Sequence, residues 1–208
     1  MVVPTEQADV IVAALKTVAA SLRDAGIPFA LGGGMAAWAR GGPPTEHDVD
    51  LVIRPQDVDA ALALLESAGL PTDRPPEGWL VKTWVDGVLI DLIHCPLGLD
   101  VDAVLRDRCE VLSVGAVDMP VMCPDDILVT KLLALTEHEL NLSPPLTYAR
   151  ALREQIDWSD VARRVQTSPF ARAFLVLLEE LGIVEPRSDA AQRPTELRTR
   201  PRVVRGSA

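Results

Sequence analysis

Apolar residues near the start of the chain recur at two different spacings, and each spacing predicts one kind of element. In residues 6–25 they return every three or four positions, which is typical of an amphipathic helix, and Gly26 is a common helix stop. The runs 27–31 and 48–53 are short and rich in apolar residues, as expected of strands. Three glycines and a short helix-prone run from Met35 lie between them. Together they predict a strand–turn–helix–strand unit.

The middle of the chain carries a β-hairpin signal. The apolar runs 80–85 and 88–94 flank Asp86-Gly87, a dipeptide that favours two-residue hairpin turns. Trp84 and Trp79 are expected to pack against this hairpin, although Trp79 also stands where it can border a cleft. The same rules predict two helices (57–68 and 100–108), a proline-rich loop (71–78) and two further strands (110–113 and 117–122).

After Pro124 the pattern becomes helical. Asp125 is expected to cap a helix that runs to about His138. Three more helical segments follow at 146–156, 158–166 and 170–181. From Glu185 the chain is rich in Pro, Arg and Ser and lacks periodicity, which predicts a disordered basic tail. The expected parts are an α/β core (1–123), a helical C-terminal subdomain (124–184) and the tail (185–208).

Composition and charge restrict the classes of function. The chain has 208 residues and is 48% hydrophobic, which is ample for a core. Its formal net charge of −10 argues against general coating of nucleic acid. The three cysteines form no disulfide framework and no CxxC metal pair. Neither a signal peptide nor an apolar run of about 18 residues is visible. We therefore expect a cytoplasmic protein without a membrane span.

Candidate chemistry is concentrated in the strand–turn–helix–strand unit. Glycines 32–34 let the backbone approach a ligand closely, and the following helix directs free N–H groups to the same place, which suits a phosphate. Side chains alternate along a strand, so Asp48 and Asp50 share one face, about 6.6 Å apart. Two carboxylates among Val, Leu and Ile need a compensating cation. Mg²⁺ is the hard, oxygen-binding cation that also binds phosphates.

The glycine pair 33–34, thirteen further residues and the strand start Asp48-Val-Asp50 resemble the signature of the DNA polymerase β-like nucleotidyltransferase superfamily. In that signature a third carboxylate lies on a neighbouring strand, and Asp91 fits this position. The resemblance implies a nucleotidyltransferase-fold mixed β-sheet with flanking helices, followed by a helical C-terminal part. It also implies that Asp48, Asp50 and Asp91 hold two Mg²⁺ ions about 3.5–4 Å apart and bind an NTP substrate through them.

Two later positions extend the resemblance to bacterial nucleotidyltransferases of the AbiEii and MenT toxin type. These carry a lysine comparable to Lys131, followed by a helix start comparable to that at Asp157. By resemblance Lys131 contacts a phosphate, and Asp157 orients that lysine or assists proton removal. Lys131 as an exposed surface lysine, and Asp157 as a helix cap, are the open alternatives.

The glycine pair departs from the family pattern at one position. Many members have Ser or Thr after the pair, where this chain has Met35. Nucleotide binding at Gly33, Gly34 and Met35 would then depend on backbone N–H groups.

Three functions remain open at this point. The first is a toxin-like enzyme that transfers a nucleoside monophosphate from an NTP to tRNA and has a separate antitoxin as partner. The second is a small-molecule nucleotidyltransferase of the aminoglycoside type, because an acidic cleft suits a cationic acceptor. The third is a catalytically silent nucleotide-binding module. On the first interpretation the arginines of 187–208 would raise the local concentration of RNA.

Overall fold

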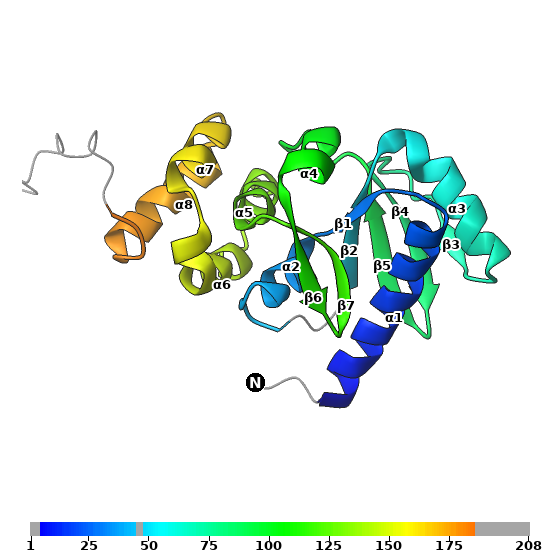
Figure 1. The fold of residues 1–208 in the computed structure, drawn as a ribbon. Coiled ribbons are helices and arrows are strands. Elements are labelled where there is room, and N and C mark those ends of the chain that lie inside the picture. The colour runs from blue at the N-terminus through cyan, green and yellow to red at the C-terminus, as the bar shows by residue number, and fades with distance from the viewer. Residues whose placement is uncertain (1–4, 45–47, 186–208) are drawn as a thin grey trace, which may run out of the picture.

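The computed structural model describes residues 5–44 and 48–185, with side chains from Ala8 onwards (Figure 1). Its centre is a seven-stranded sheet in the order β3-β4-β5-β2-β1-β7-β6. The strands are β1 (Phe29–Leu31), β2 (Asp48–Ile53), β3 (Thr72–Asp73), β4 (Leu80–Val85), β5 (Val88–Ile93), β6 (Cys109–Val114) and β7 (Val117–Met122). β2 pairs in parallel with β5, and β1 with β7, while the other neighbours are antiparallel. The predicted mixed α/β class is confirmed.

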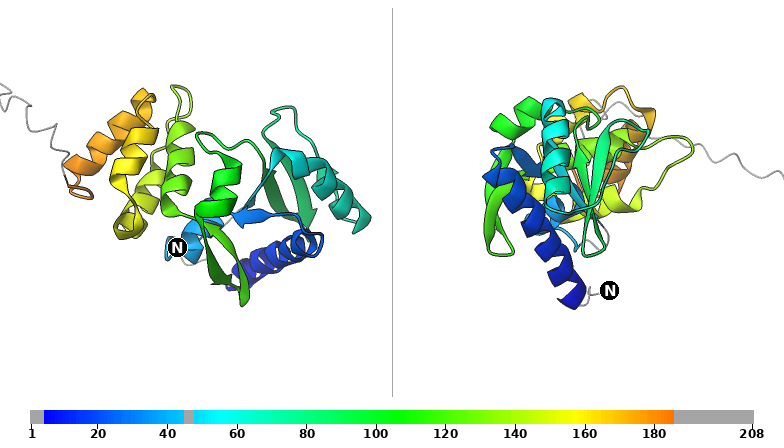
Figure 2. Two further views of the ribbon diagram at one scale, coloured as in Figure 1. Left: turned by 45° about the horizontal axis from the view of Figure 1, so that its top comes forward. Right: turned by 90° about the vertical axis from the view of Figure 1, so that its right-hand side faces the viewer.

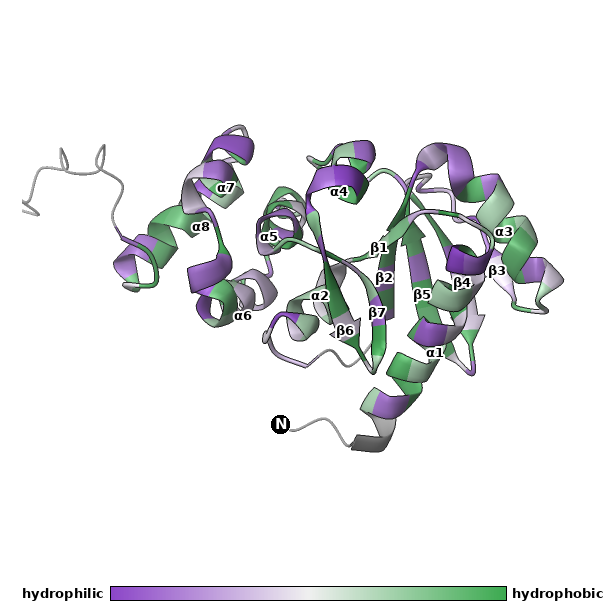
Figure 3. Cartoon of the chain, in the orientation of Figure 1, coloured by the Kyte–Doolittle hydropathy of each residue, from purple (hydrophilic) through white to green (hydrophobic). Residues whose placement is uncertain are grey.

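Helices flank this sheet and continue beyond it. They are α1 (Thr5–Asp24), α2 (Gly33–Ala39), α3 (Val58–Ser67), α4 (Val101–Asp107), α5 (Pro124–Leu133), α6 (Ser143–Leu152), α7 (Trp158–Arg164) and α8 (Pro169–Glu180), with short 3₁₀ turns at Pro55–Asp57 and Arg153–Gln155. α1 lies along β1, β2 and β5 and packs on α3 (Figure 2). Apolar residues dominate the strands (Figure 3). Val49, Leu51 and Ile53 are fully buried on one face of β2, so its aspartates project from the other face.

The register of four elements brings polar residues into one row across the sheet. Asp50 of β2 pairs with Asp91 of the parallel strand β5, and Asp91 pairs with Lys82 of β4. On the other side of β2, the N–H of Gly32 donates to the carbonyl of Asp50 at 2.8 Å. This row therefore joins the end of β1, where α2 begins, to the β4–β5 hairpin.

The last four helices gather beside the sheet (Figure 1). α5 contacts α2 and also packs against α6, α7 and α8, so it connects the sheet to the helical part. Its apolar residues Leu128 and Leu132 are buried, as are Phe174 and Leu178 of α8. The helical character after Pro124 is confirmed, and the division at residue 123 stays a prediction.

Several predicted boundaries are corrected. The first helix after the glycines begins at Gly33, two residues before the expected start. The loop at 71–78 contains the short strand β3, which pairs with β4. α5 ends at Leu133, five residues before His138, and its N-cap is Cys123. The tail from 186 and residues 45–47 lie outside the described part of the chain. Within that part, no helix is long and apolar enough to cross a membrane.

Candidate active site

Three carboxylates converge at the polar row of the sheet. One oxygen from each of Asp48, Asp50 and Asp91 lies within 4.8 Å of the other two. Asp91 is buried, and the two β2 aspartates are partly buried. Among the described residues, no hydrogen-bond donor contacts the side chains of Asp48 or Asp50. Convergent carboxylate oxygens without protein donors form the ligand set that a hard divalent cation such as Mg²⁺ prefers.

The electrostatics of this triad show the cost of crowding negative charge. Burial, and after it the negative charge of Asp48, raise the pKa of Asp50 to about 6, against the opposing positive charge of Lys131. Burial also raises the pKa of Asp91, while the hydrogen bond from Lys82 lowers it. A cation bound at the triad would relieve this repulsion, so the residues present fit a metal site.

Lys82 is the one basic residue of the described chain in hydrogen-bond contact with the triad. Its Nζ donates to Oδ1 of Asp91 at 3.1 Å. The sequence interpretation missed this residue, although the signal was present. A two-residue turn at Asp86-Gly87 pairs Val85 with Val88, and continuing that register places Lys82 opposite Asp91.

The glycine turn is packed directly on the triad. Gly33 has φ of +53°, a conformation that favours glycine. A Cβ added there would lie 1.6 Å from Oδ2 of Asp50. Gly33, Gly34 and Met35 open α2, and the first N–H groups of a helix have no partner within it. The backbone donors expected to meet a phosphate thus begin next to the Asp50 carboxylate, and the side chain of Met35 is buried.

A cavity of about 410 Å³ opens beside this arrangement. Gly33, Asp50 and Lys131 line it, so the sheet and α5 both contribute to its walls. Lys131 lies on the last turns of α5, near enough for its charge to lower the pKa of Asp50. The structure therefore places Lys131 in the same cavity as Asp50, and its contact with a phosphate stays a prediction. Trp79, which the sequence placed at a possible cleft border, also lines the cavity.

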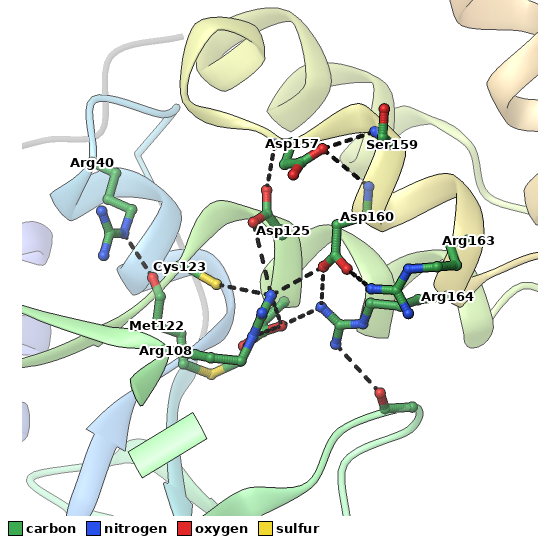
Figure 4. Close-up of polar contacts among 12 residues, drawn as sticks. Arg40, Arg108, Met122, Cys123, Asp125, Asp157, Ser159, Asp160, Arg163 and Arg164 are labelled. Carbon is green, nitrogen blue, oxygen red and sulfur yellow. Dashed lines mark hydrogen bonds and ion pairs between the residues drawn. The ribbon is translucent and has the colours of Figure 1, made fainter. Parts of the chain in front are cut away.

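Asp157 lies in a different set of contacts (Figure 4). Its Oδ1 accepts the N–H groups of Ser159 and Asp160, so it caps α7. Its own N–H donates to Oδ1 of Asp125 at 2.8 Å. The prediction that Asp125 caps its own helix is therefore wrong: its side chain makes no capping hydrogen bond on α5 and instead accepts the N–H of Asp157 at the start of α7. No contact within the described chain joins Asp157 to Lys131 or to the triad, so the capping alternative is the one its contacts support.

The same region contains a buried ionic cluster, which we define as Arg108, Asp126, Asp160 and Arg164 (Figure 4). Asp126 is fully buried and accepts from Arg108 at 2.9 Å and from Arg164 at 2.6 Å. Asp160 accepts from the same two arginines. The cluster ties the end of α4 to the start of α5 and to α7.

Tyr148 is a second residue near the triad that the sequence interpretation missed. It lies on α6 and is partly buried. Burial raises its pKa, and the negative charges of Asp50 and Asp48 raise it further, which places its hydroxyl within their field. No sequence pattern marks this position, because its approach to β2 depends on how α6 packs on α5.

Comparisons with known proteins agree with this geometry. Residues 4–181 match the profile of a family described as uncharacterised nucleotidyltransferase. No curated protein matches the chain.

Two solved structures of one enzyme share the fold, and a third structure matches with a TM-score below 0.5. The crystal structure of ANT(2″)-Ia in complex with adenylyl-2″-tobramycin has a TM-score of 0.55 and 15% identity, covering 78% of this chain and 95% of that one. The solution structure of the antibiotic-resistance factor ANT(2″)-Ia has a TM-score of 0.54 and 16% identity, covering 82% and 94%. A tRNA nucleotidyltransferase complexed with a primer tRNA and an incoming ATP analog has a TM-score of 0.36 and 13% identity, covering 81% and 61%.

Proposed function

Because the chain belongs to the uncharacterised nucleotidyltransferase family, we propose that it transfers a nucleoside monophosphate from a Mg²⁺-bound NTP to an acceptor hydroxyl at the triad. The observation that carries this proposal is the convergence of Asp48, Asp50 and Asp91 within 4.8 Å beside the cavity. Nucleotidyl transfer requires mainly the positioning of the reactants and the neutralisation of phosphate charge. The site has backbone N–H groups and carboxylates that would position a metal-bound NTP, and a lysine that would neutralise charge.

The residues around the cavity divide this work. Asp48, Asp50 and Asp91 would hold one or two Mg²⁺ ions, which when bound neutralise phosphate charge and lower the pKa of the attacking hydroxyl. The first N–H groups of α2 bind phosphate oxygens next to Asp50. Lys131 adds a positive charge from the opposite wall of the cavity.

The charge of the protein favours a small cationic acceptor. The net charge is −10, although six arginines of the chain lie in 187–208, so the rest of the chain is more acidic still. A negative surface attracts cations and repels a polyanion such as RNA. The crystal structure of ANT(2″)-Ia, which shares this fold, contains adenylyl-2″-tobramycin, an aminoglycoside product.

A tRNA acceptor is the second candidate, and the arginines of 187–208 are the observation that favours it. On this proposal the protein is a toxin of a toxin–antitoxin pair, and a separate antitoxin is its partner. Truncation after Glu185 tests the contribution of the tail. Transfer to tRNA should weaken at low salt and change little at high salt, because salt screens phosphate contacts.

One labelling experiment separates the candidates. The protein is incubated with Mg²⁺ and each α-³²P-labelled NTP, together with either total tRNA or an aminoglycoside panel, and Asp50→Asn serves as the inactive control. Label in a drug supports the small-molecule proposal, and label in RNA supports the toxin proposal. Label in neither acceptor, with the nucleotide still bound, would leave the silent binding module as the function.

A further inference from the structure

The cavity beside the triad has a polar end and an apolar end. The polar end contains Asp50 and Lys131. Val52 and Ile93 follow Asp50 and Asp91 by two residues on their strands, so they lie on the same face about 6.6 Å further along, and they pair with each other. The sheet face that carries the carboxylates is therefore apolar only two residues further along each strand, and this apolar part forms the floor of the cavity.

Beyond this floor the cavity ends in large apolar side chains that are exposed. Trp79 is 43% exposed and Leu97 is 55% exposed, and both line the cavity. Exposed large apolar groups gathered at a hollow are unusual in a monomer and mark a binding surface. Within the described chain, the indole N–H of Trp79 has no hydrogen-bond partner.

The backbone of Trp79 is fixed although its ring is exposed. Its carbonyl accepts the N–H of His94 at 3.0 Å and that of Cys95 at 3.2 Å. These bonds attach Trp79 to His94 and Cys95, the two residues that follow the end of β5 at Ile93. The backbone of Trp79 is therefore held beside the strand that carries Asp91, and its exposed ring is free to turn onto a flat ligand.

The distribution of polar and apolar residues in the cavity suits the NTP better than it suits a cationic acceptor. An NTP carries its negative charge at one end and a flat, weakly polar ring at the other. A polycationic acceptor needs several carboxylates, but Asp50 is the one acidic residue lining this cavity. We propose that Trp79 stacks on the nucleobase of the NTP and sets its position; this inference rests on the proposed function.

The opposite side of the triad offers the competing aromatic residue. Trp84 aligns with Leu89, and Leu89 with Asp48, so Trp84 lies on the same face of the sheet at the level of Asp48, away from Val52 and Ile93. Trp84 does not line the cavity that contains Asp50 and Lys131.

Calorimetric titration of the whole protein with Mg²⁺-ATP and, separately, with Mg²⁺ and inorganic triphosphate tests the inference without any acceptor. GTP, CTP and UTP are titrated in parallel. Trp79→Ala should weaken binding of the preferred NTP by about one to two orders of magnitude, the range of base–aromatic stacking, and leave triphosphate binding unchanged. Trp79→Phe should restore most of the NTP affinity. Trp38 is a tryptophan on α2 with a similar exposed fraction that does not line this cavity, so Trp38→Ala should bind as the wild type does.

Each other result has a defined meaning. Equal NTP affinity in Trp79→Ala and wild type overturns the inference, and so does a loss that appears in Trp84→Ala instead or that affects triphosphate equally. Failure of the wild-type protein to bind triphosphate in the presence of Mg²⁺ would count against the proposed function itself. Thermal melts of Trp79→Ala identify misfolding, and in that case the comparison of Trp79→Phe with Trp79→Leu decides whether an aromatic ring is required.

Discussion

The carboxylate of Asp50 occupies the space that any side chain on Gly33 would need. A Cβ at Gly33 would lie 1.6 Å from Oδ2 of Asp50, far below any allowed contact. Gly33 also has a positive φ, so two independent constraints act on the same position. The glycine turn therefore packs directly on the triad, so the backbone N–H groups proposed to bind phosphate lie next to the candidate metal ligands.

Gly33→Ala should therefore lower the rate of transfer strongly while the protein remains folded. The added methyl group displaces Asp50 by an ångström or more, and a misplacement of that size costs about two orders of magnitude in rate. The change should appear in kcat, measured with saturating NTP. Backbone strain at the positive φ adds about 1–2 kcal/mol of destabilisation.

Gly69→Ala is the matched control for this substitution. Gly69 also has a positive φ, of +78°, but a Cβ there would contact nothing within 4 Å. By urea denaturation it should show only the loss of about 1–2 kcal/mol that comes from backbone strain, and it should keep its activity. Equal activity losses in both variants would mean that strain, and not the clash with Asp50, is responsible.

Much of the strand–turn–helix–strand unit and of the sheet around it could be predicted from the sequence, because the patterns that define these elements are local. The bounds of β2 and β7 were predicted to the residue, since alternation and flanking turns define them. The resemblance then supplied Asp91 and Lys131. In the fold, the carboxylate of Asp91 lies beside that of Asp50, and Lys131 lines the same cavity as Asp50. Lys82 was within reach as well, because the hairpin register that identifies it is local.

Other features depend on contacts between distant segments, and no local pattern encodes them. Asp125 illustrates this: it was expected to cap its own helix, but its carboxylate accepts the N–H of Asp157, 32 residues further along the chain. Tyr148 reaches the field of the triad only through the packing of α6 on α5. Such relations are properties of the tertiary fold and not of the spacing along the chain.

Asp48→Asn and Asp50→Asn should abolish transfer without unfolding the protein. Each removes one candidate ligand from the triad, and each also relieves repulsion between neighbouring carboxylates. Thermal melts in EDTA should show equal or higher melting temperatures than the wild type. Asp118→Asn, at an exposed position on β7, is the control and should remain active. Near-normal rates in either triad variant would remove the metal assignment.

Lys131→Ala should raise the KM for NTP or lower kcat by about one to three orders of magnitude. A cation that contacts phosphate in the transition state contributes several kcal/mol in comparable sites. Steady-state kinetics at varied NTP concentration separates the two effects. Lys16→Ala on α1, away from the cavity lining, is the control. Wild-type kinetics in Lys131→Ala would return this residue to the surface-lysine interpretation.

The metal-free protein should become more stable as the pH falls from 7 towards 4. The pKa of Asp50 is about 6 in the folded protein and near 3.8 in an unfolded chain, so the folded state holds the proton more tightly. Stability from this group is present at low pH and is lost as the pH rises through about 6. A pKa difference of about two units corresponds to on the order of 2 kcal/mol.

Asp50→Asn provides the test of that pH dependence. Urea denaturation in EDTA at several pH values should give a smaller stability gain between pH 7 and pH 4 in this variant than in the wild type. Mg²⁺ should also remove part of the dependence at pH 7, because a bound cation favours the ionised carboxylate. Identical pH profiles for variant and wild type would show that Asp50 titrates at its ordinary value.

Asp126→Ala should destabilise the protein by about 1.5–3 kcal/mol, because Arg108 and Arg164 lose the buried carboxylate that they share, although both still pair with Asp160. Asp126 is fully buried between Arg108 and Arg164, and the cluster joins α4, α5 and α7. Urea denaturation measures the loss. Arg163→Ala is the control: Arg163 pairs with Asp160 but its side chain is 69% exposed, so its removal should cost less than about 1 kcal/mol. Since α5 also carries Lys131, Asp126→Ala should weaken NTP binding as well, whereas a stability loss no larger than that of Arg163→Ala would mean that the cluster does not hold α5 in place.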